Sequence, residues 1–178
     1  MRRIIIVLIT LAVCTGFLTE ALAGKKSSSD EFTREHINRS EISPVPKSEK
    51  VVTGNVEWKI LKVEEVGPVL EQEYTGATLE TKGKFVNIRL EAVNHSEDLK
   101  YIYDLRLADD RGRTYPICAA AYAYFGMEEA CSLAELLPDV RRTLTMFHDV
   151  PLNANDLWLE VTDLEVPPQE KKYIDLGI

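Results

Sequence analysis

Apolar and polar residues alternate along most of the chain after residue 50, which is the pattern of half-buried β-strands. In the clearest run, Val86, Ile88, Leu90 and Ala92 alternate with polar or charged neighbours. Such a run places one face of a strand on a core and leaves the other face in solvent. Similar runs predict strands at residues 56–63, 99–107, 114–118, 144–150, 157–161 and 173–176.

Turn residues separate these predicted strands. The stretch Asp109-Asp110-Arg111-Gly112 stands between two of them, Pro167-Pro168 ends another, and adjacent apolar residues at 60–61 predict a β-bulge. Only residues 119–137 suggest a helix. About seven short strands with turns between them favour an all-β, immunoglobulin-like antiparallel β-sandwich, because a parallel sheet would need long helices between its strands.

Residues 1–23 have the pattern of a secretory signal peptide. A basic start precedes the largely apolar residues 4–18, and Ala21-Leu22-Ala23 supplies the small residues that a signal peptidase needs. We therefore expect cleavage after Ala23 and a secreted or periplasmic product.

Two other fates of this segment stay open, a lipoprotein anchored at Cys14 and an uncleaved anchor. The lipoprotein is less favoured because its signal requires a small residue before the cysteine, where this chain has Val13. The apolar run is shorter than the ~20 residues that span a bilayer, and no other stretch approaches that length. We expect no transmembrane domain.

The sequence predicts a flexible linker at residues 24–50 and one domain at residues 51–178. The linker has few large apolar residues, a serine run and mixed charges. The chain is acidic, with a formal net charge of −8. That charge argues against nucleic acid or an anionic membrane as a partner, because both would repel it.

Two cysteines remain after the predicted cleavage, Cys118 and Cys131. In an oxidising compartment such a pair is typical of a disulfide. A metal or redox pair would need C-x-x-C spacing or nearby histidines, which the sequence lacks. We predict a Cys118–Cys131 disulfide.

The sequence also lacks the usual spacings of catalytic residues. It has no H-E-x-x-H motif, no G-x-S-x-G elbow and no glycine-rich phosphate loop. We predict no enzyme, no catalytic or metal-binding residues and no cofactor. Asp104, Asp109 and Asp110 come nearest to a calcium site, but Arg111 and Arg113 follow at once, so a solvated hairpin turn is favoured.

Residues 119–127 are apolar and aromatic and lie between the two cysteines. The favoured interpretation is that this segment packs over an open end of the sandwich. The functional alternative is a surface for a protein partner, which would centre on Tyr122, Tyr124 and Phe125, because aromatic side chains on loops often anchor interfaces.

Three stretches, at residues 83–96, 103–115 and 136–151, carry a family resemblance in their order and spacing. Together they resemble a large bacterial family of secreted immunoglobulin-like domains of unknown function, similar in fold to the mycobacterial immunoprotective extracellular protein. The chain departs from the family at Pro138-Asp139, where Pro-Gly is usual. The resemblance implies a fold and an extracytoplasmic location, and it supplies no catalytic residues.

These observations predict an exported, non-catalytic binding or cell-envelope interaction module with an unidentified protein partner. Two alternatives from other classes stay open, an envelope-associated enzyme and a small-molecule or metal-binding carrier. An enzyme would need a converging acid–base pair, and a carrier would use the acidic residues at 104–110. The oligomeric state is left open.

Overall fold

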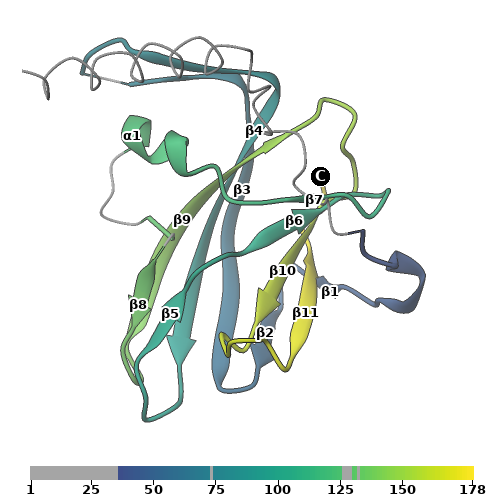
Figure 1. Cartoon of the computed structure of the whole chain (residues 1–178), viewed down its shortest axis with the longest axis vertical. Coiled ribbons are helices and arrows are strands. Elements are labelled where there is room, and N and C mark those ends of the chain that lie inside the picture. The colour runs from purple at the N-terminus through teal and green to yellow at the C-terminus, as the bar shows by residue number, and fades with distance from the viewer. Residues whose placement is uncertain (1–35, 73, 126–129, 132) are drawn as a thin grey trace, which may run out of the picture. The chain divides into compact units, whose positions relative to one another are not determined.

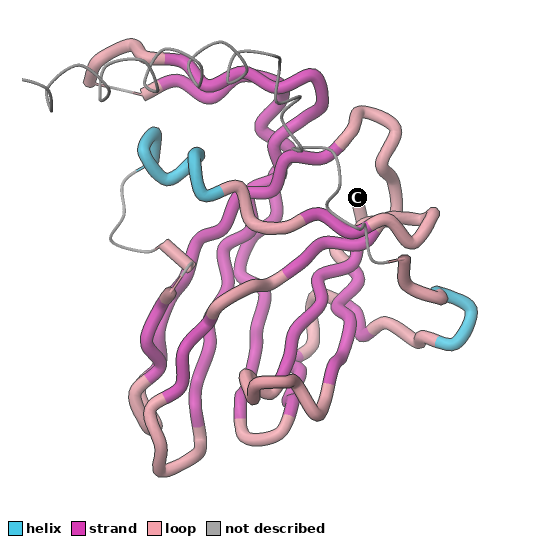
Figure 2. Tube along the Cα trace, viewed as in Figure 1, coloured by secondary structure: helices cyan, strands magenta, loops and turns pink. Residues whose placement is uncertain are grey.

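A computed structural model describes residues 36–178 apart from 73, 126–129 and 132, and the described residues belong to one compact unit. Strands make up most of its trace, and helix is confined to short stretches (Figure 2). The helical elements are η1 (Arg39–Glu41), η2 (Ala119–Ala121) and α1 (Tyr122–Phe125). The strands are β1 (Val45–Pro46), β2 (Lys50–Thr53), β3 (Val56–Glu71), β4 (Thr78–Asn94), β5 (Lys100–Ile102), β6 (Arg106–Ala108), β7 (Thr114–Tyr115), β8 (Ala134–Leu136), β9 (Arg141–Val150), β10 (Trp158–Thr162) and β11 (Lys171–Asp175).

Two sheets form the layers of a β-sandwich (Figure 1). One has the order β1-β11-β10-β6-β7 and the other has the order β2-β3-β4-β9, while β5 and β8 form a small third sheet. Apart from the parallel pair β1–β11, the strand pairs are antiparallel. The predicted all-β, immunoglobulin-like sandwich is therefore confirmed. The predicted strand at 99–107 is divided into β5 and β6, and β1, β2 and β8 lie outside the predicted strands.

The main core lies between the sheets. Trp58, Leu90 and Leu144 point inward from the four-stranded sheet, and Leu107 and Leu159 point inward from the five-stranded sheet; all five are fully buried. The alternation at residues 86–92 therefore assigned the inner face correctly. A register shift between Ile60 and Lys62 confirms the bulge that was predicted in β3.

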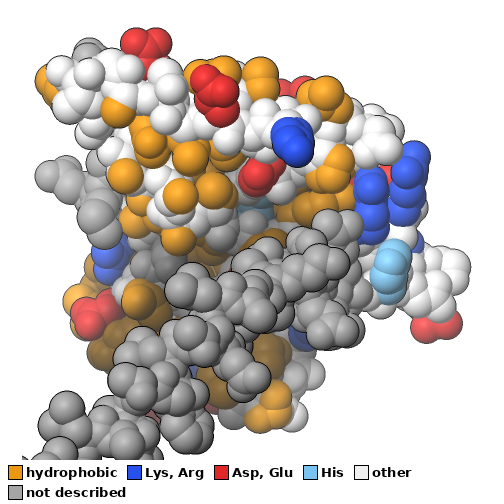
Figure 3. Space-filling view, turned by 45° about the horizontal axis from the view of Figure 1, so that its top comes forward, with side chains coloured by type: hydrophobic (Ala, Val, Ile, Leu, Met, Phe, Trp, Pro, Cys, Tyr) orange, Lys and Arg blue, Asp and Glu red, His pale blue; other side chains and the backbone are white. Residues whose placement is uncertain are grey.

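A second, smaller core covers part of the outer face of the four-stranded sheet. Leu70 and Phe85 from the β3–β4 ribbon and Phe147 from β9 pack there against Ala121 and Tyr122. In the described part of the stretch 119–137, which was expected to be helical, helix is limited to η2 and α1, and β8 occupies Ala134–Leu136. In a space-filling view, hydrophobic side chains gather on one face, with charged side chains scattered among them (Figure 3).

The expected inner face of residues 99–107 is wrong at its beginning. Ile102 is buried, whereas Tyr101 and Tyr103 are 36% and 56% exposed. The cause is a change of sheet within this stretch, because β5 pairs with β8 and β6 pairs with β10. Two exposed residues in succession, Tyr103 and Asp104, shift the alternation before it resumes at Leu105.

Residues 36–50, the second part of the segment expected to be a linker, contact the domain. β1 adds a parallel strand to β11, and Val45 packs against the main core. The N–H of Ile37 donates to the carbonyl of Gly112 at 3.0 Å. A Cβ at Gly112 would lie 2.4 Å from the carbonyl oxygen of Ile37, so this contact requires glycine. The start of the expected linker and the predicted cleavage site lie outside the described residues.

No helix among the described residues is long and apolar enough to cross a membrane. The turn in which the chain departs from the family pattern has Asp139 at a φ of 55°. This is the left-handed conformation that glycine adopts most easily, so the backbone is the one that a Pro-Gly turn would suit.

Candidate functional site

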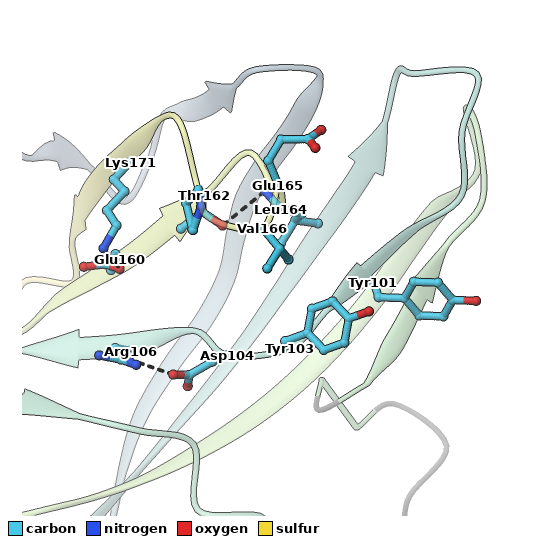
Figure 4. A pocket seen from close by; sticks show the side chains of 11 residues that line it. Tyr101, Tyr103, Asp104, Arg106, Glu160, Thr162, Leu164, Glu165, Val166 and Lys171 are labelled. Carbon is cyan, nitrogen blue, oxygen red and sulfur yellow. Dashed lines mark hydrogen bonds and ion pairs between the residues drawn. The ribbon is translucent and has the colours of Figure 1, made fainter. Parts of the chain in front are cut away.

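A groove opens where β6 separates from β10. The two strands pair from Trp158 opposite Ala108 to Glu160 opposite Arg106. Beyond that point the chain of residues 101–105 turns away toward β8, while β10 continues to Thr162. The divergence leaves a pocket of about 450 Å³ between β10, the β5–β6 segment and the loop at 164–168 (Figure 4).

One wall of this pocket is aromatic. Tyr101 and Tyr103 lie on the same side of the β5–β6 segment, with ring centroids 6.1 Å apart and an angle of 38° between the ring planes. We call these two residues the tyrosine pair. Val166, on the facing loop, is 81% exposed. Exposed aromatic and apolar side chains gathered beside a hollow are typical of binding sites.

The floor of the pocket is charged, and its charges are paired. Arg106 Nε donates to Asp104 Oδ2 at 2.7 Å, and Lys171 Nζ lies 3.0 Å from Glu160 Oε1. The hydroxyl of Tyr173 donates to Glu160 Oε2 at 2.9 Å. Alternation explains the position of these side chains, because Glu160 points outward from a strand whose neighbours Leu159 and Val161 point into the core.

The loop that forms the rim is held by one buried carboxylate. Asp163 accepts hydrogen bonds from the backbone N–H groups of Glu165, Gln169 and Glu170 at 3.0–3.3 Å. Lys100 Nζ lies 2.6 Å from Glu165 Oε1 and so ties the loop to β5. These bonds give the rim a defined shape before any ligand binds.

A second pocket, of about 470 Å³, adjoins the first. Both pockets share the tyrosine pair and residues 164–166, so the tyrosines stand between them. Asn55, Ser96 and Lys100 are among the residues that line its far side. Together the two pockets make one groove with an aromatic centre and polar ends.

The acidic residues at 104–110 do not form one site. Asp109 is fully buried, and its carboxylate accepts from Arg113 Nε at 2.6 Å and from the hydroxyl of Tyr115 at 2.7 Å. Burial alone would raise the pKa of Asp109, but these bonds outweigh it and lower that pKa. The expected solvated turn is therefore wrong for Asp109, which holds the hairpin together, while Asp104 lines the groove and Asp110 is exposed.

Within the described ranges, no three His, Cys, Asp or Glu side chains gather in a way that could hold a metal ion. His36 is exposed, and His95 Nδ1 lies 3.0 Å from Asp139 Oδ1 at the surface. His148 is fully buried. Its Nδ1 lies 3.1 Å from the carbonyl oxygens of Tyr115 and Pro116.

The two cysteines of the predicted disulfide are unbridged in this structure. Both are anchored to the same edge of β9. The N–H of Cys118 donates to the carbonyl of Phe147 at 2.6 Å, and the N–H of Cys131 donates to the carbonyl of Thr145 at 3.1 Å. Cys131 is fully buried, and this burial raises the pKa of its thiol to about 12.

The tyrosine-rich segment packs on the second core. Tyr122 is 5% exposed, its ring meets that of Phe147 edge-on with centroids 6.5 Å apart, and its hydroxyl accepts from the N–H of Cys131 at 3.2 Å. Tyr124 is partly buried, and its hydroxyl donates to the carbonyl of Thr78 at 3.2 Å. The packing interpretation thus describes Tyr122. The backbone of Phe125 ends α1.

Sequence reasoning missed the groove residues because it took 99–107 as one strand with an unbroken alternation, which puts Tyr101 and Tyr103 on the same face as Leu105 and Leu107. Ile102, an apolar residue out of phase between two tyrosines, is the signal that could have revealed the change of sheet. Arg106 and Lys171 gave no signal, because surface strands commonly carry charged side chains.

No family model and no curated protein matches this chain. Solved structures do match. The yjhA protein from Bacillus subtilis has a TM-score of 0.55 at 12% sequence identity, over 75% of this chain and 99% of that one. A conserved hypothetical protein from Bacillus anthracis has a TM-score of 0.53 at 15% identity, over 72% and 93%. The secreted protein MPT63 from Mycobacterium tuberculosis also matches, with a TM-score of 0.47 at 12% identity over 75% and 98%.

The two Bacillus structures carry the comparison, and they show a shared fold. The predicted resemblance to bacterial immunoglobulin-like domains is confirmed at that level. At these sequence identities the matches say nothing about a ligand or partner.

Proposed function

We propose that this chain is an exported, non-catalytic binding module whose ligand occupies the groove between β10 and the β5–β6 segment. The observation that carries the proposal is the tyrosine pair, exposed beside a hollow whose floor and rim are held by hydrogen bonds. A rigid scaffold with exposed aromatic side chains binds at a low entropic cost, because few groups need ordering.

The charged groups of the groove support binding over catalysis. Asp104 is bonded to Arg106, and Glu160 is held between Lys171 and Tyr173. A hydrolase would use a carboxylate or histidine within reach of its substrate to transfer protons. Here each floor carboxylate has a fixed partner, Asp104 within its own segment and Glu160 from the neighbouring β11, which suits both to recognition.

Export to the cell envelope is the second part of the proposal. It rests on the signal-peptide pattern of residues 1–23, with its basic start, apolar run and small residues at 21–23. A lipoprotein anchored at Cys14 is the alternative. Both would place the domain outside the cytoplasm, where an envelope component could reach the groove.

The tyrosine-rich segment is the other candidate contact surface. Its use by a protein partner through Tyr122, Tyr124 and Phe125 stays a prediction. The burial of Tyr122 supports the groove instead, because a residue that anchors an interface must reach the partner without unfolding its own core.

Retention on the native cell envelope tests the proposal. We expect the purified domain to co-sediment with an envelope fraction and a Tyr101→Ala, Tyr103→Ala double variant to lose most of this retention. The control is Tyr74→Ala, because Tyr74 is 91% exposed and lines neither pocket. Melting temperatures should be similar for all three proteins. Undiminished retention of a folded double variant would refute the proposal.

A further inference from the structure

The charges that line the groove nearly cancel. Taken together, the linings of the two pockets contain four carboxylates and three cations, which sum to a net charge of −1. The carboxylates are those of Asp98, Asp104, Glu160 and Glu165, and the cations are Lys100, Arg106 and Lys171. A strongly charged ligand finds no opposite field here, because three ion pairs neutralise most of the lining. The lining therefore fits a ligand without net charge.

The same ion pairs place donors beside acceptors. The donor–acceptor distances are 2.7 Å for Arg106 with Asp104, 3.0 Å for Lys171 with Glu160 and 2.6 Å for Lys100 with Glu165. A hydroxyl group both donates and accepts a hydrogen bond, so it can bond to both members of such a pair at once. Three such positions along the groove match a molecule with many hydroxyl groups.

The tyrosine pair matches the other property of such molecules. A pyranose ring has hydroxyls at its edge and C–H groups on its faces, and the C–H faces stack on aromatic rings. Tyr101 and Tyr103 offer two adjacent rings, with centroids 6.1 Å apart, at the meeting point of the two pockets. Pockets for small ligands typically measure about 300–1,000 Å³. The two pockets, at about 450 and 470 Å³, fall in this range on each side of the rings.

From this arrangement we infer that the groove binds a neutral oligosaccharide, with sugar rings stacked on the tyrosine pair and hydroxyl groups bonded to the ion pairs. The inference rests on the proposed function and names the class of its ligand. Because pockets extend to both sides of the tyrosines, the ligand is a chain of several sugar units.

A proline-rich peptide is the main competing ligand, since such peptides also bind in aromatic-lined grooves. Proline lacks a backbone N–H group, so a peptide of this kind offers acceptors and few donors. It would displace water from the carboxylates of Asp104, Glu160 and Glu165 without supplying donors to replace that water, which is unfavourable. The ion pairs therefore favour the saccharide.

The test is titration of the mature domain, followed by two-dimensional NMR, with neutral hexaoses of glucose and of N-acetylglucosamine. We expect at least one of them to perturb the amide signals of residues 101–106 and 160–166. Tyr103→Ala should weaken its binding at least tenfold, whereas Tyr103→Phe, which keeps the aromatic ring, and Tyr74→Ala should bind like the wild type. Deca-proline and heparin serve as competitor probes and should bind weakly or elsewhere.

The outcomes separate the ligand class from the proposed function. If no hexaose binds while the double tyrosine variant loses envelope retention, the saccharide is refuted and the binding groove stands. Groove binding by deca-proline or heparin in place of the hexaoses has the same meaning. Saccharide binding that Tyr103→Ala leaves intact refutes this site. If the double variant keeps its envelope retention, the proposed function fails, whatever the hexaoses do.

Discussion

The guanidinium carbon of Arg39 lies 3.2 Å from the centroid of the Trp158 ring. Two further bonds fix the guanidinium, because Arg39 donates to the carbonyl and to the carboxylate of Asp156, each at 2.7 Å. Trp158 is on the outer face of β10, yet it is only 7% exposed. A residue from the expected linker thus contributes to covering the five-stranded sheet.

We predict that Arg39→Ala lowers the free energy of unfolding by about 1–2 kcal/mol, because it removes a largely desolvated cation–π contact and its hydrogen bonds. The fluorescence of Trp158 should shift to the red as solvent reaches the ring. Urea unfolding followed by fluorescence measures both effects. The matched control is Arg141→Ala, whose guanidinium is mostly exposed and 3.9 Å from Glu91. Equal effects of the two substitutions would contradict the stacking role.

The sandwich could be predicted because it depends on local alternation. Trp58 and Leu90 each sit in a run of period two, and both are fully buried. Adjacent side chains in a strand point to opposite faces, so the inner face follows from the sequence as long as a strand stays in one sheet.

The groove could not be predicted because it depends on where a strand changes sheet. Tyr101 and Tyr103 share the period-two phase of the buried Leu105 and Leu107, but pairing of β5 with β8 turns the intervening Ile102 inward instead. The contact of Arg39 with Trp158 joins segments more than 100 residues apart, and no local pattern encodes such a pairing.

His148 gives a prediction for acid stability. Burial lowers its pKa to about 4, from an ordinary value of 6.5. Its Nδ1 must carry a proton to donate to the two carbonyl oxygens, and its Nε2 is buried without a hydrogen-bond partner in the described structure. The unfolded chain therefore binds a proton below about pH 6.5 that the folded protein rejects until about pH 4.

The stability linked to His148 is thus fully present above pH 6.5 and is lost as the pH falls toward 4, by about 3 kcal/mol. We predict that His148→Gln, which does not titrate, has a shallower decline of unfolding free energy over this window. Urea titrations at several pH values measure it. The pKa of Asp109 is lowered, so its contribution to the free energy of unfolding is also lost in acid. That loss is the same in the wild type and in His148→Gln. Parallel curves for the two proteins would show that His148 titrates normally.

The Cys118–Cys131 disulfide stays a prediction, and the anchoring of both cysteines on β9 supports it. Their N–H groups bind carbonyls two residues apart on one strand, so the two acceptors are about 7 Å apart and the cysteines lie along the same short stretch of one edge. We predict that protein from an exporting host carries the bond and that its reduction costs about 3 kcal/mol, because the bond restricts the unfolded chain.

Intact-mass measurement without reductant, followed by thermal melting with and without it, checks this prediction. Because the pKa of Cys131 is about 12 in the folded protein, its thiol should react slowly once the chain has folded, since the thiolate is the reactive form. Bond formation is then expected before folding is complete. Two free thiols in protein from the native envelope would rule out the disulfide.

The tyrosine-rich segment provides the last prediction, which separates packing from partner binding. Tyr122 is buried in the second core together with Phe147 and Leu70. Tyr122→Ala should therefore lower the free energy of unfolding by about 3 kcal/mol, because it leaves a cavity. Tyr124 is only partly buried, and Tyr124→Ala should cost about 1 kcal/mol or less. Thermal melting of the two variants measures the difference.

Pull-down from the native envelope then addresses the partner surface of Tyr122, Tyr124 and Phe125. If a protein partner binds there, Tyr124→Ala should reduce its recovery with little change in melting temperature, because an aromatic contact is lost while the fold is kept. If the segment serves only to cover the four-stranded sheet, recovery should follow stability, and Tyr122→Ala should have the larger effect. Loss of partner from Tyr122→Ala at an unchanged melting temperature would contradict its role in the second core.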